Sequence, residues 1–200
     1  MTEIKNIVFD IGRVLVNLHL DVIEKFLLEY DATHSNLKDF TRHSGYLEHE
    51  RGDISRDEFF QRVQTICQRD VDFNTFRQVW QGIFSPNIPM LELAQSLKQQ
   101  YGVYILSNTN PLHWEVLQQD YQLHELVHGV VTSFEARAMK PEPVIYEHLI
   151  NRFNLIPAET LFIDDLAENA QGARDCGWLA IHHTSNEDSL RKISALNIRY

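Results

Sequence analysis

Polar residues with complementary chemistry come directly after three short apolar runs of this chain. These residues are Asp10, Ser107 with Asn108, and Asp164 with Asp165. The carboxyl ends of parallel strands meet at one edge of an open α/β sheet, which is where ligands bind in such folds. If the three runs are strands of one sheet, the sequence predicts a cluster of carboxylates beside a hydroxyl and an amide at that edge.

Asp10 is placed as a nucleophile would be, at the end of a buried strand. Taken alone, an Asp at a strand end more often caps a turn, but the later polar residues favour the catalytic interpretation. Lys140 precedes a predicted helix and can reach the same edge. The Ser107 hydroxyl and the Asn108 backbone N–H can bind phosphate oxygens, and Lys140 can neutralise both phosphate and carboxylates. Clustered carboxylates would repel each other without a cation, so Mg²⁺ is the expected cofactor.

The elements that must position these residues alternate between short apolar runs and helical patterns. Predicted strands span 4–9, 103–106, 129–132, 160–163 and 179–182. Predicted helices span 89–100, 112–120, 143–153 and 167–176, and a last helix starts near 184. This alternation indicates an α/β fold with a doubly wound parallel sheet.

Residues 21–84 interrupt this alternation with helical patterns alone. Ser55 and Glu58 form a capping box at the start of one helix, and the aromatic spacing from Phe73 to Phe84 predicts another. We interpret this region as a helical cap inserted after the first strand. The predicted division is a core of residues 1–17 and 86–200 and a cap of residues 18–85.

The composition limits the classes of partner. The chain has 200 residues with 18 basic and 28 acidic side chains, a net charge of −10. No basic patch for nucleic acid stands out, and an acidic protein is repelled by anionic membranes. Two cysteines, no signal-peptide pattern and no apolar run of about 20 residues predict a soluble, cytoplasmic protein. We expect a small phosphorylated substrate, no nucleic-acid or membrane partner, and a monomer.

Four motifs in this order resemble those of the haloacid dehalogenase (HAD) superfamily, on its Mg²⁺-dependent phosphatase side. They are Phe9-Asp10-Ile11-Gly12, Leu106-Ser107-Asn108-Thr109, Met139-Lys140-Pro141 and Phe162-Ile163-Asp164-Asp165. The resemblance covers about residues 4–17 and 86–183, and it implies a Rossmann-like core. Three stretches more narrowly resemble phosphatases that act on α-glucose 1-phosphate. These are Asp10-Ile11-Gly12, His49-Glu50-Arg51-Gly52 and Ser107-Asn108-Thr109-Asn110.

The resemblance implies roles for the residues at the predicted edge. Asp10 would attack phosphorus and form an aspartyl-phosphate that water then hydrolyses. The resemblance implies a Mg²⁺ site made by the Asp10 carboxylate, the Gly12 carbonyl oxygen and Asp165, with Asp164 binding directly or through water.

The phosphoryl group has its own implied partners. Ser107, Asn108 and Lys140 would bind it during transfer. Asn169 is placed to orient the acidic pair.

Gly12 departs from the pattern of most phosphatases of this family, which carry a second Asp there to protonate the leaving group. Such acid help is typically worth ~10²–10⁴-fold. One explanation is a leaving group that needs less protonation, such as the anomeric oxygen of a sugar 1-phosphate. The other is a cap residue that supplies the proton. The candidates are His19, His49, Glu50 and His113. We expect the first explanation to hold, with a cap residue assisting.

Two other functions remain open from the sequence. A 2-haloacid dehalogenase also lacks the second Asp and needs no metal, although paired acids at 164–165 would repel its carboxylate substrate. A catalytically silent relative that binds a phosphorylated ligand is favoured by Gly12 and disfavoured by the intact acidic set. The stretch His49-Glu50-Arg51-Gly52 is either a polar helix end or a functional segment, in which Glu50 and Arg51 of the cap could contact sugar hydroxyls.

Overall fold

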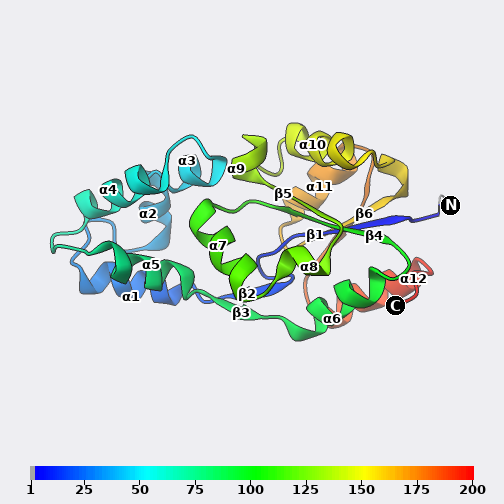
Figure 1. Ribbon diagram of the computed structural model, residues 1–200, viewed down its shortest axis with the longest axis horizontal. Coiled ribbons are helices and arrows are strands. Elements are labelled where there is room, and N and C mark those ends of the chain that lie inside the picture. The colour runs from blue at the N-terminus through cyan, green and yellow to red at the C-terminus, as the bar shows by residue number, and fades with distance from the viewer. Residues whose placement is uncertain (1–2) are drawn as a thin grey trace.

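A five-stranded parallel sheet forms the centre of the computed structural model, which describes residues 3–200 (Figure 1). Its strands are β1 (Asn6–Phe9), β4 (Gly102–Ser107), β5 (Gly129–Thr132), β6 (Thr160–Asp164) and β7 (Leu179–His182). The spatial order is β5-β4-β1-β6-β7, with every neighbouring pair parallel. Since β1 lies at the centre and the chain winds outward on both sides, the predicted doubly wound fold is confirmed.

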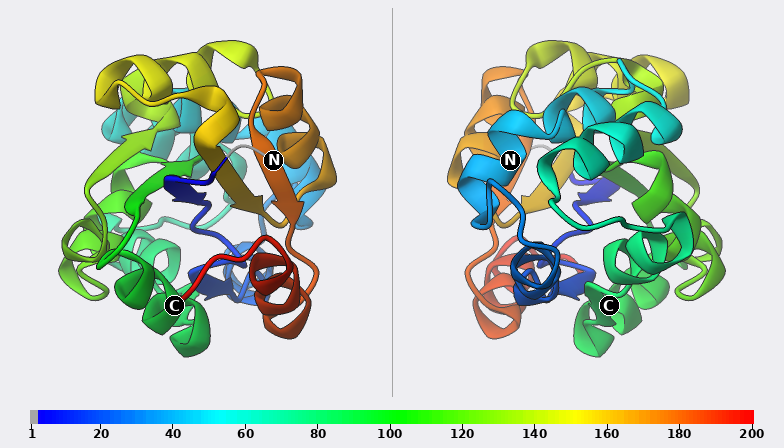
Figure 2. Two further views of the ribbon diagram at one scale, coloured as in Figure 1. Left: turned by 90° about the vertical axis from the view of Figure 1, so that its right-hand side faces the viewer. Right: turned by 90° about the vertical axis from the view of Figure 1, so that its left-hand side faces the viewer.

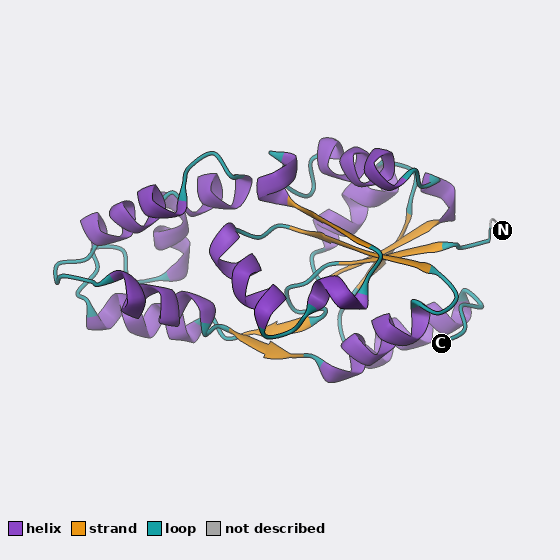
Figure 3. Ribbon diagram, in the orientation of Figure 1, coloured by secondary structure: helices purple, strands orange, loops and turns teal. Residues whose placement is uncertain are grey.

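Helices cover both faces of this sheet (Figure 3). Successive strand side chains point to opposite faces, so Ile7 and Phe9 pack with α6 (Ile88–Leu97) and α12 (Asn186–Ala195), whereas Val8 packs with α10 (Pro143–Phe153) and α11 (Ala167–Asp175). Burial on both faces explains why the strand sequences are apolar runs without polar alternation. The remaining elements outside the cap are α7 (Pro111–Gln119), α8 (Leu123–Leu126), α9 (Ser133–Ala136) and the 3-10 turn Pro157–Glu159.

The inserted region is helical, as the sequence indicates. It contains α1 (Asp21–Glu29), α2 (Leu37–His43), α3 (Tyr46–Arg51), α4 (Arg56–Ile66) and α5 (Phe73–Gln81). One half of the predicted capping box is present, because the Ser55 side chain accepts a hydrogen bond from the Glu58 N–H at 3.1 Å. The Glu58 carboxylate accepts instead from Arg62. In the right-hand view of Figure 2 these helices lie in front of the sheet.

The cap has an aromatic core of its own. Trp80 is buried there, with its ring centroid 5.1 Å from that of Phe59 and 5.3 Å from that of Phe76. These cap residues form a hydrophobic cluster separate from the two clusters on the faces of the sheet. Separate cores support the predicted division into core and cap, whose boundaries remain a prediction.

A two-stranded antiparallel ribbon, β2 (Val16–Leu18) with β3 (Phe84–Pro86), joins the cap to the core. The sequence analysis did not predict this ribbon, and its placement of Phe84 in a helix is wrong, because α5 ends at Gln81. Three-residue strands are too short to show an alternating pattern. The two strands lie on opposite sides of the inserted cap in the sequence, so their pairing is a tertiary contact.

Two further observations concern membranes and cysteines. Across residues 3–200, the helices are too short or too polar to cross a bilayer. Both cysteines are free and partly buried, as expected for small side chains without a disulfide partner.

Candidate active site

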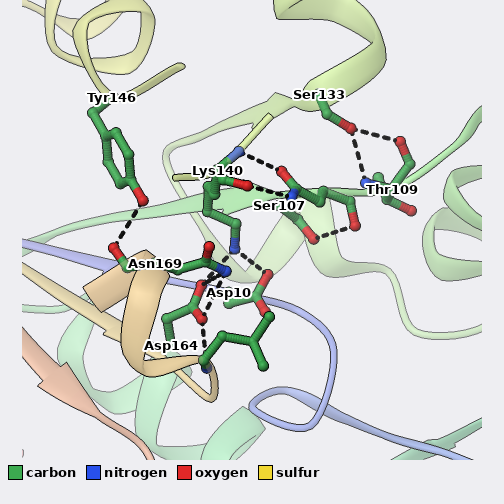
Figure 4. Close-up of polar contacts among 10 residues, drawn as sticks. Asp10, Ser107, Thr109, Ser133, Lys140, Tyr146, Asp164 and Asn169 are labelled. Carbon is green, nitrogen blue, oxygen red and sulfur yellow. Dashed lines mark hydrogen bonds and ion pairs between the residues drawn. The ribbon is translucent and has the colours of Figure 1, made fainter. Parts of the chain in front are cut away.

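The predicted strand-end residues converge where the sheet faces the cap (Figure 4). Asp10 follows β1, Ser107 ends β4 and Asp164 ends β6. The register pairs Phe9 with a residue of each neighbouring strand, Ile105 of β4 and Ile163 of β6. The central strand therefore delivers Asp10 between the ends of its two neighbours, as the sequence predicts.

Lys140 lies between two of these carboxylates. Its Nζ is 2.7 Å from Asp10 Oδ1 and 2.6 Å from Asp164 Oδ2, and its side chain is only 1% exposed. Burial alone would lower the pKa of the Lys140 ammonium, but the two carboxylates outweigh it and the pKa lies above its usual value. Lys140 is therefore a permanent cation in the centre of the acidic cluster.

The Asp164 carboxylate is fully buried and held on both oxygens. Oδ1 accepts hydrogen bonds from the Leu166 N–H at 2.8 Å and from Asn169 Nδ2 at 3.0 Å, and Asn169 Nδ2 also lies 3.2 Å from Oδ2. The Tyr146 hydroxyl in turn donates to the Asn169 backbone oxygen at 2.8 Å (Figure 4). The predicted orienting contact of Asn169 is thus made with Asp164.

Asp165 is half-buried at the rim of the cluster. Arg13 Nη1 lies 3.7 Å from its carboxylate, and His182 Nε2 lies 3.0 Å from its backbone oxygen. Burial and then the neighbouring Asp164 charge raise the pKa of Asp165. Burial likewise raises the pKa of Asp10 above its usual range, and Lys140 opposes that rise. A cation bound at the cluster would favour the ionised form of both carboxyl groups.

The donor set fits a divalent cation. Asp10, Asp164 and Asp165 each offer a carboxylate oxygen, and these oxygens lie within 4.8 Å of one another. Three carboxylates around one buried lysine leave excess negative charge, and hard oxygen donors are the ligands that Mg²⁺ prefers. Gly12, two residues after the central strand-end carboxylate, lies in the turn that bridges to Val16. The binding of Mg²⁺ by its carbonyl oxygen remains a prediction.

The residues expected to bind phosphate lie at the end of β4 and directly after it. Ser107 is buried at the end of β4. The Asn108 side chain is committed elsewhere, because its Nδ2 donates to the Lys140 backbone oxygen at 3.0 Å and its Oδ1 accepts from the Lys140 N–H at 2.8 Å. The Asn108 side chain therefore holds the backbone of Lys140 in place. The backbone N–H of Asn108 is the group that remains to bind phosphate.

A cavity of about 70 Å³ lies between core and cap residues and reaches Gly12, Ser107 and Asn108 of the predicted site. Its walls combine core and cap residues. They are Ile11, Gly12, Leu18, Leu20, Tyr46, Glu50, Ile83, Phe84, Ser107, Asn108, Thr109, His113 and Leu117. Of the four candidate proton donors, Glu50 and His113 therefore line the cavity. His113 belongs to α7, outside the predicted cap. His19 is hydrogen-bonded to Ser85, and His49 stacks on Phe59 inside the cap.

Helix α3 of the cap docks on α9 of the core, a contact that the sequence analysis missed. The Ser133 hydroxyl donates to the Glu50 backbone oxygen at 2.6 Å and accepts from the Thr109 N–H at 3.0 Å. Arg51 makes two hydrogen bonds to Glu142, at 2.9 and 2.5 Å. The Arg51 guanidinium thus binds the core, and its contact with sugar hydroxyls remains a prediction. No local signal in the sequence marks Ser133 as a partner.

Together, the fold and the site define a class of hydrolase with a strand-end Asp, a buried lysine and an acidic cluster beneath a helical cap. The chain belongs to the haloacid dehalogenase-like hydrolase family, whose model matches residues 4–177.

Three comparisons describe its relatives. It is 29% identical to a D-ribitol-5-phosphate phosphatase of Bacteroides thetaiotaomicron, over 96% of this chain and 98% of the relative. It is 28% identical to a sesquiterpene phosphatase of Aspergillus oryzae, over 92% of both chains. A crystal structure of a HAD-family enzyme from Bacteroides thetaiotaomicron, in complex with magnesium and inorganic phosphate, superposes with a TM-score of 0.81. That match has 28% identity and covers 89% of this chain and 93% of the other.

Proposed function

We propose that this protein is a Mg²⁺-dependent phosphatase that hydrolyses a small phosphomonoester, a sugar phosphate such as glucose 1-phosphate, through an aspartyl-phosphate. The observation that carries the proposal is the buried Lys140 ammonium between Asp10 and Asp164, beside the third carboxylate of Asp165. The relatives named as phosphatases and the magnesium and phosphate bound in a structural neighbour support it. Cytoplasmic location and a monomeric state remain predictions.

The chain's own residues divide the work of the reaction. The Asp10 carboxylate attacks phosphorus, and Lys140 holds that carboxylate in place while neutralising charge on the transferring phosphoryl group. The Ser107 hydroxyl and the Asn108 backbone N–H bind phosphoryl oxygens. Mg²⁺, bound by the Asp10, Asp164 and Asp165 carboxylates and the Gly12 carbonyl oxygen, would supply Lewis-acid stabilisation of the same charge.

The choice of a sugar phosphate rests on the narrower motif resemblance. The relative that acts on D-ribitol 5-phosphate supports a polyol or sugar, and the sesquiterpene phosphatase supports an apolar alcohol as the alternative. Comparing glucose 1-phosphate, ribitol 5-phosphate and a prenyl phosphate as substrates distinguishes these classes.

The testing experiment measures phosphate release from that panel, with Mg²⁺ and with a chelator, for the wild type and for Asp10→Asn. We expect Mg²⁺-dependent release that falls by roughly 10⁴-fold or more in the variant, because the nucleophile is lost. Asp70→Asn, a change at an exposed carboxylate, should retain full activity. Release that survives in Asp10→Asn would exclude the aspartyl-phosphate route.

Two further measurements distinguish the rival functions. Chloride release from 2-chloropropionate in the presence of a chelator would identify a dehalogenase. Retained binding of Mg²⁺ and inorganic phosphate without turnover of any ester would identify a catalytically silent relative.

A further inference from the structure

The alcohol released from a phosphomonoester must take up a proton, and Gly12 has no side chain to give one. A β-carbon at Gly12 would contact Leu18 Cδ1 at 3.3 Å, so the leucine side chain occupies the space beside this position. We therefore look for the proton donor among the groups that line the cavity together with Gly12. In the part of the chain that the structure describes, Glu50 and His113 are the cavity-lining residues among the four sequence candidates.

His113 is unsuitable as the proton donor. Asn110 Oδ1 accepts from the His113 N–H at 3.0 Å, so the Asn110 amide group faces His113 Nδ1 as a donor, also at 3.0 Å. Nδ1 is thus the unprotonated nitrogen of a neutral ring. Burial lowers the pKa of His113 to about 3. A neutral imidazole can donate a hydrogen bond from Nε2 but cannot release that proton near neutral pH.

Glu50 has the properties that a proton donor needs. Its side chain lines the cavity together with Gly12, Ser107 and Asn108, and the residue is only 7% exposed. The Tyr46 hydroxyl donates to Glu50 Oε1 at 2.5 Å and fixes the carboxyl group. Burial is the main cause that raises the pKa of Glu50 to about 7, and the nearby Asp10 charge adds to it, while Tyr46 and Lys140 oppose it. A carboxyl group with such a pKa is present in both its acid and its base form near neutral pH.

We propose that Glu50 of the cap is the general acid and base of this site, replacing the acid that Gly12 lacks. The proposal rests on the proposed phosphatase function. As Asp10 Oδ attacks, the bond from phosphorus to the leaving oxygen breaks and its electron pair stays on that oxygen. The Glu50 carboxyl gives its proton to this oxygen, and the alcohol leaves.

The second half of the reaction restores the Asp10 carboxylate and the protonated Glu50. Water attacks phosphorus of the aspartyl-phosphate, and the Glu50 carboxylate takes one of its protons. The bond between phosphorus and the Asp10 oxygen breaks, its electron pair returns to Asp10, and inorganic phosphate is released. Glu50 is again protonated, so the cycle balances without a further co-reactant.

The docking of α3 explains how a cap residue can hold a catalytic position. The Glu50 backbone oxygen is tied through Ser133 to Thr109, two residues after Ser107 of the core. At Gly52 a β-carbon would lie 2.7 Å from the Phe134 carbonyl oxygen, so the backbone of α3 sits directly against α9. The proton donor is therefore positioned by the same contact that brings the cap onto the core.

The test compares two leaving groups in the wild type and in Glu50→Gln, with Mg²⁺ present. p-Nitrophenyl phosphate releases an anion that is stable without a proton, whereas ribitol 5-phosphate releases an alkoxide that needs one. For the variant we expect kcat/KM to fall ~10²–10⁴-fold on ribitol 5-phosphate and much less on p-nitrophenyl phosphate. Glu48→Gln, an exposed residue of the same helix, should leave both rates unchanged.

An equal loss on both esters, or no loss on either, would overturn the proposal. A wild type that hydrolyses neither ester would instead contradict the phosphatase function itself. A measurement on the wild type alone gives a second test if the variant does not fold. With a proton donor present, kcat/KM over a series of esters should depend weakly on the acidity of the leaving alcohol, and a steep dependence would overturn the role of Glu50.

Discussion

The core side and the cap side of the candidate site, here the core wall and the cap wall, handle charge in opposite ways. On the core wall, Lys140 lies between ionisable carboxylates and compensates them directly, with Nζ–O distances of 2.6 and 2.7 Å. On the cap wall, Glu50 is buried with a tyrosine hydroxyl as its hydrogen-bond partner, and its pKa rises. The core wall thus favours charged groups that bind metal and phosphate, whereas the cap wall favours a carboxyl group that can hold a proton.

The largest stability effect should come from breaking the compensation on the core wall. Lys140→Met leaves Asp10 and Asp164 buried without their cation, which typically costs about 3–5 kcal/mol. Urea unfolding in the absence of Mg²⁺ should show this loss. Lys25→Met, which removes an exposed lysine paired with Asp21, should change the midpoint little. A comparable midpoint for both variants would mean that the buried cation contributes little to stability.

A smaller effect should appear in the pH dependence of the cap wall. The pKa of Glu50 is about 7 in the folded state and near 4.5 in the unfolded chain, so the native state binds its proton more tightly. The contribution of Glu50 to the unfolding free energy is therefore greatest below pH 4.5 and falls as the pH rises to 7, by up to about 3 kcal/mol. The difference between wild type and Glu50→Gln, measured by urea unfolding at several pH values, should show this slope. Parallel profiles would contradict it.

The contact that joins the walls can be probed at two glycines with the same left-handed backbone. Gly52 and Gly177 have φ of 78° and 84°, so an alanine at either costs about 1 kcal/mol in strain. At Gly52 the new β-carbon also meets the Phe134 carbonyl oxygen at 2.7 Å, whereas at Gly177 the nearest atom is 3.6 Å away. We expect Gly52→Ala to lower thermal stability more and to reduce activity. Equal effects would show that α3 does not depend on this close approach.

The smallest effect should come from the ion pair at the edge of the same contact. Arg51 and Glu142 are 34% and 42% exposed, and such partly solvated pairs contribute about 0.2–1 kcal/mol. A double-mutant cycle with Arg51→Gln and Glu142→Gln should give a coupling energy in this range that decreases at high salt. A larger, salt-independent coupling would place the pair among the principal contacts that hold the cap down.

The site on the core wall was predictable because its residues follow from strand periodicity. Asp10, Ser107 and Asp164 each end an apolar run, and parallel strands must bring such ends together. Lys140 was predictable as a cation that could reach this edge. The Asn108 side chain was less so, because its two hydrogen bonds to the Lys140 backbone depend on the path of a distant loop.

The cap wall was only partly predictable. Glu50 stood among four candidates, and the sequence analysis preferred a leaving group that needs little acid help. Phe84 was assigned to a helix, although it begins β3 of the ribbon between cap and core. These features depend on pairings between segments far apart in the chain, which leave no periodic signal.

The sequence by itself determined the order of strands and helices, the acidic cluster with its lysine, and the absence of an acid at Gly12. It did so because apolar periodicity and strand-end chemistry are local properties. Only the tertiary structure decided which candidate groups share a cavity with Gly12. The contact of Glu50 with Ser133 joins residues 83 positions apart, and this packing removes the carboxyl group from water and places it on the cavity. Burial and proximity across such a distance arise from folding. The position on the cavity distinguishes Glu50 from His19 and His49, and the hydrogen bond of Asn110 to the His113 ring distinguishes it from His113.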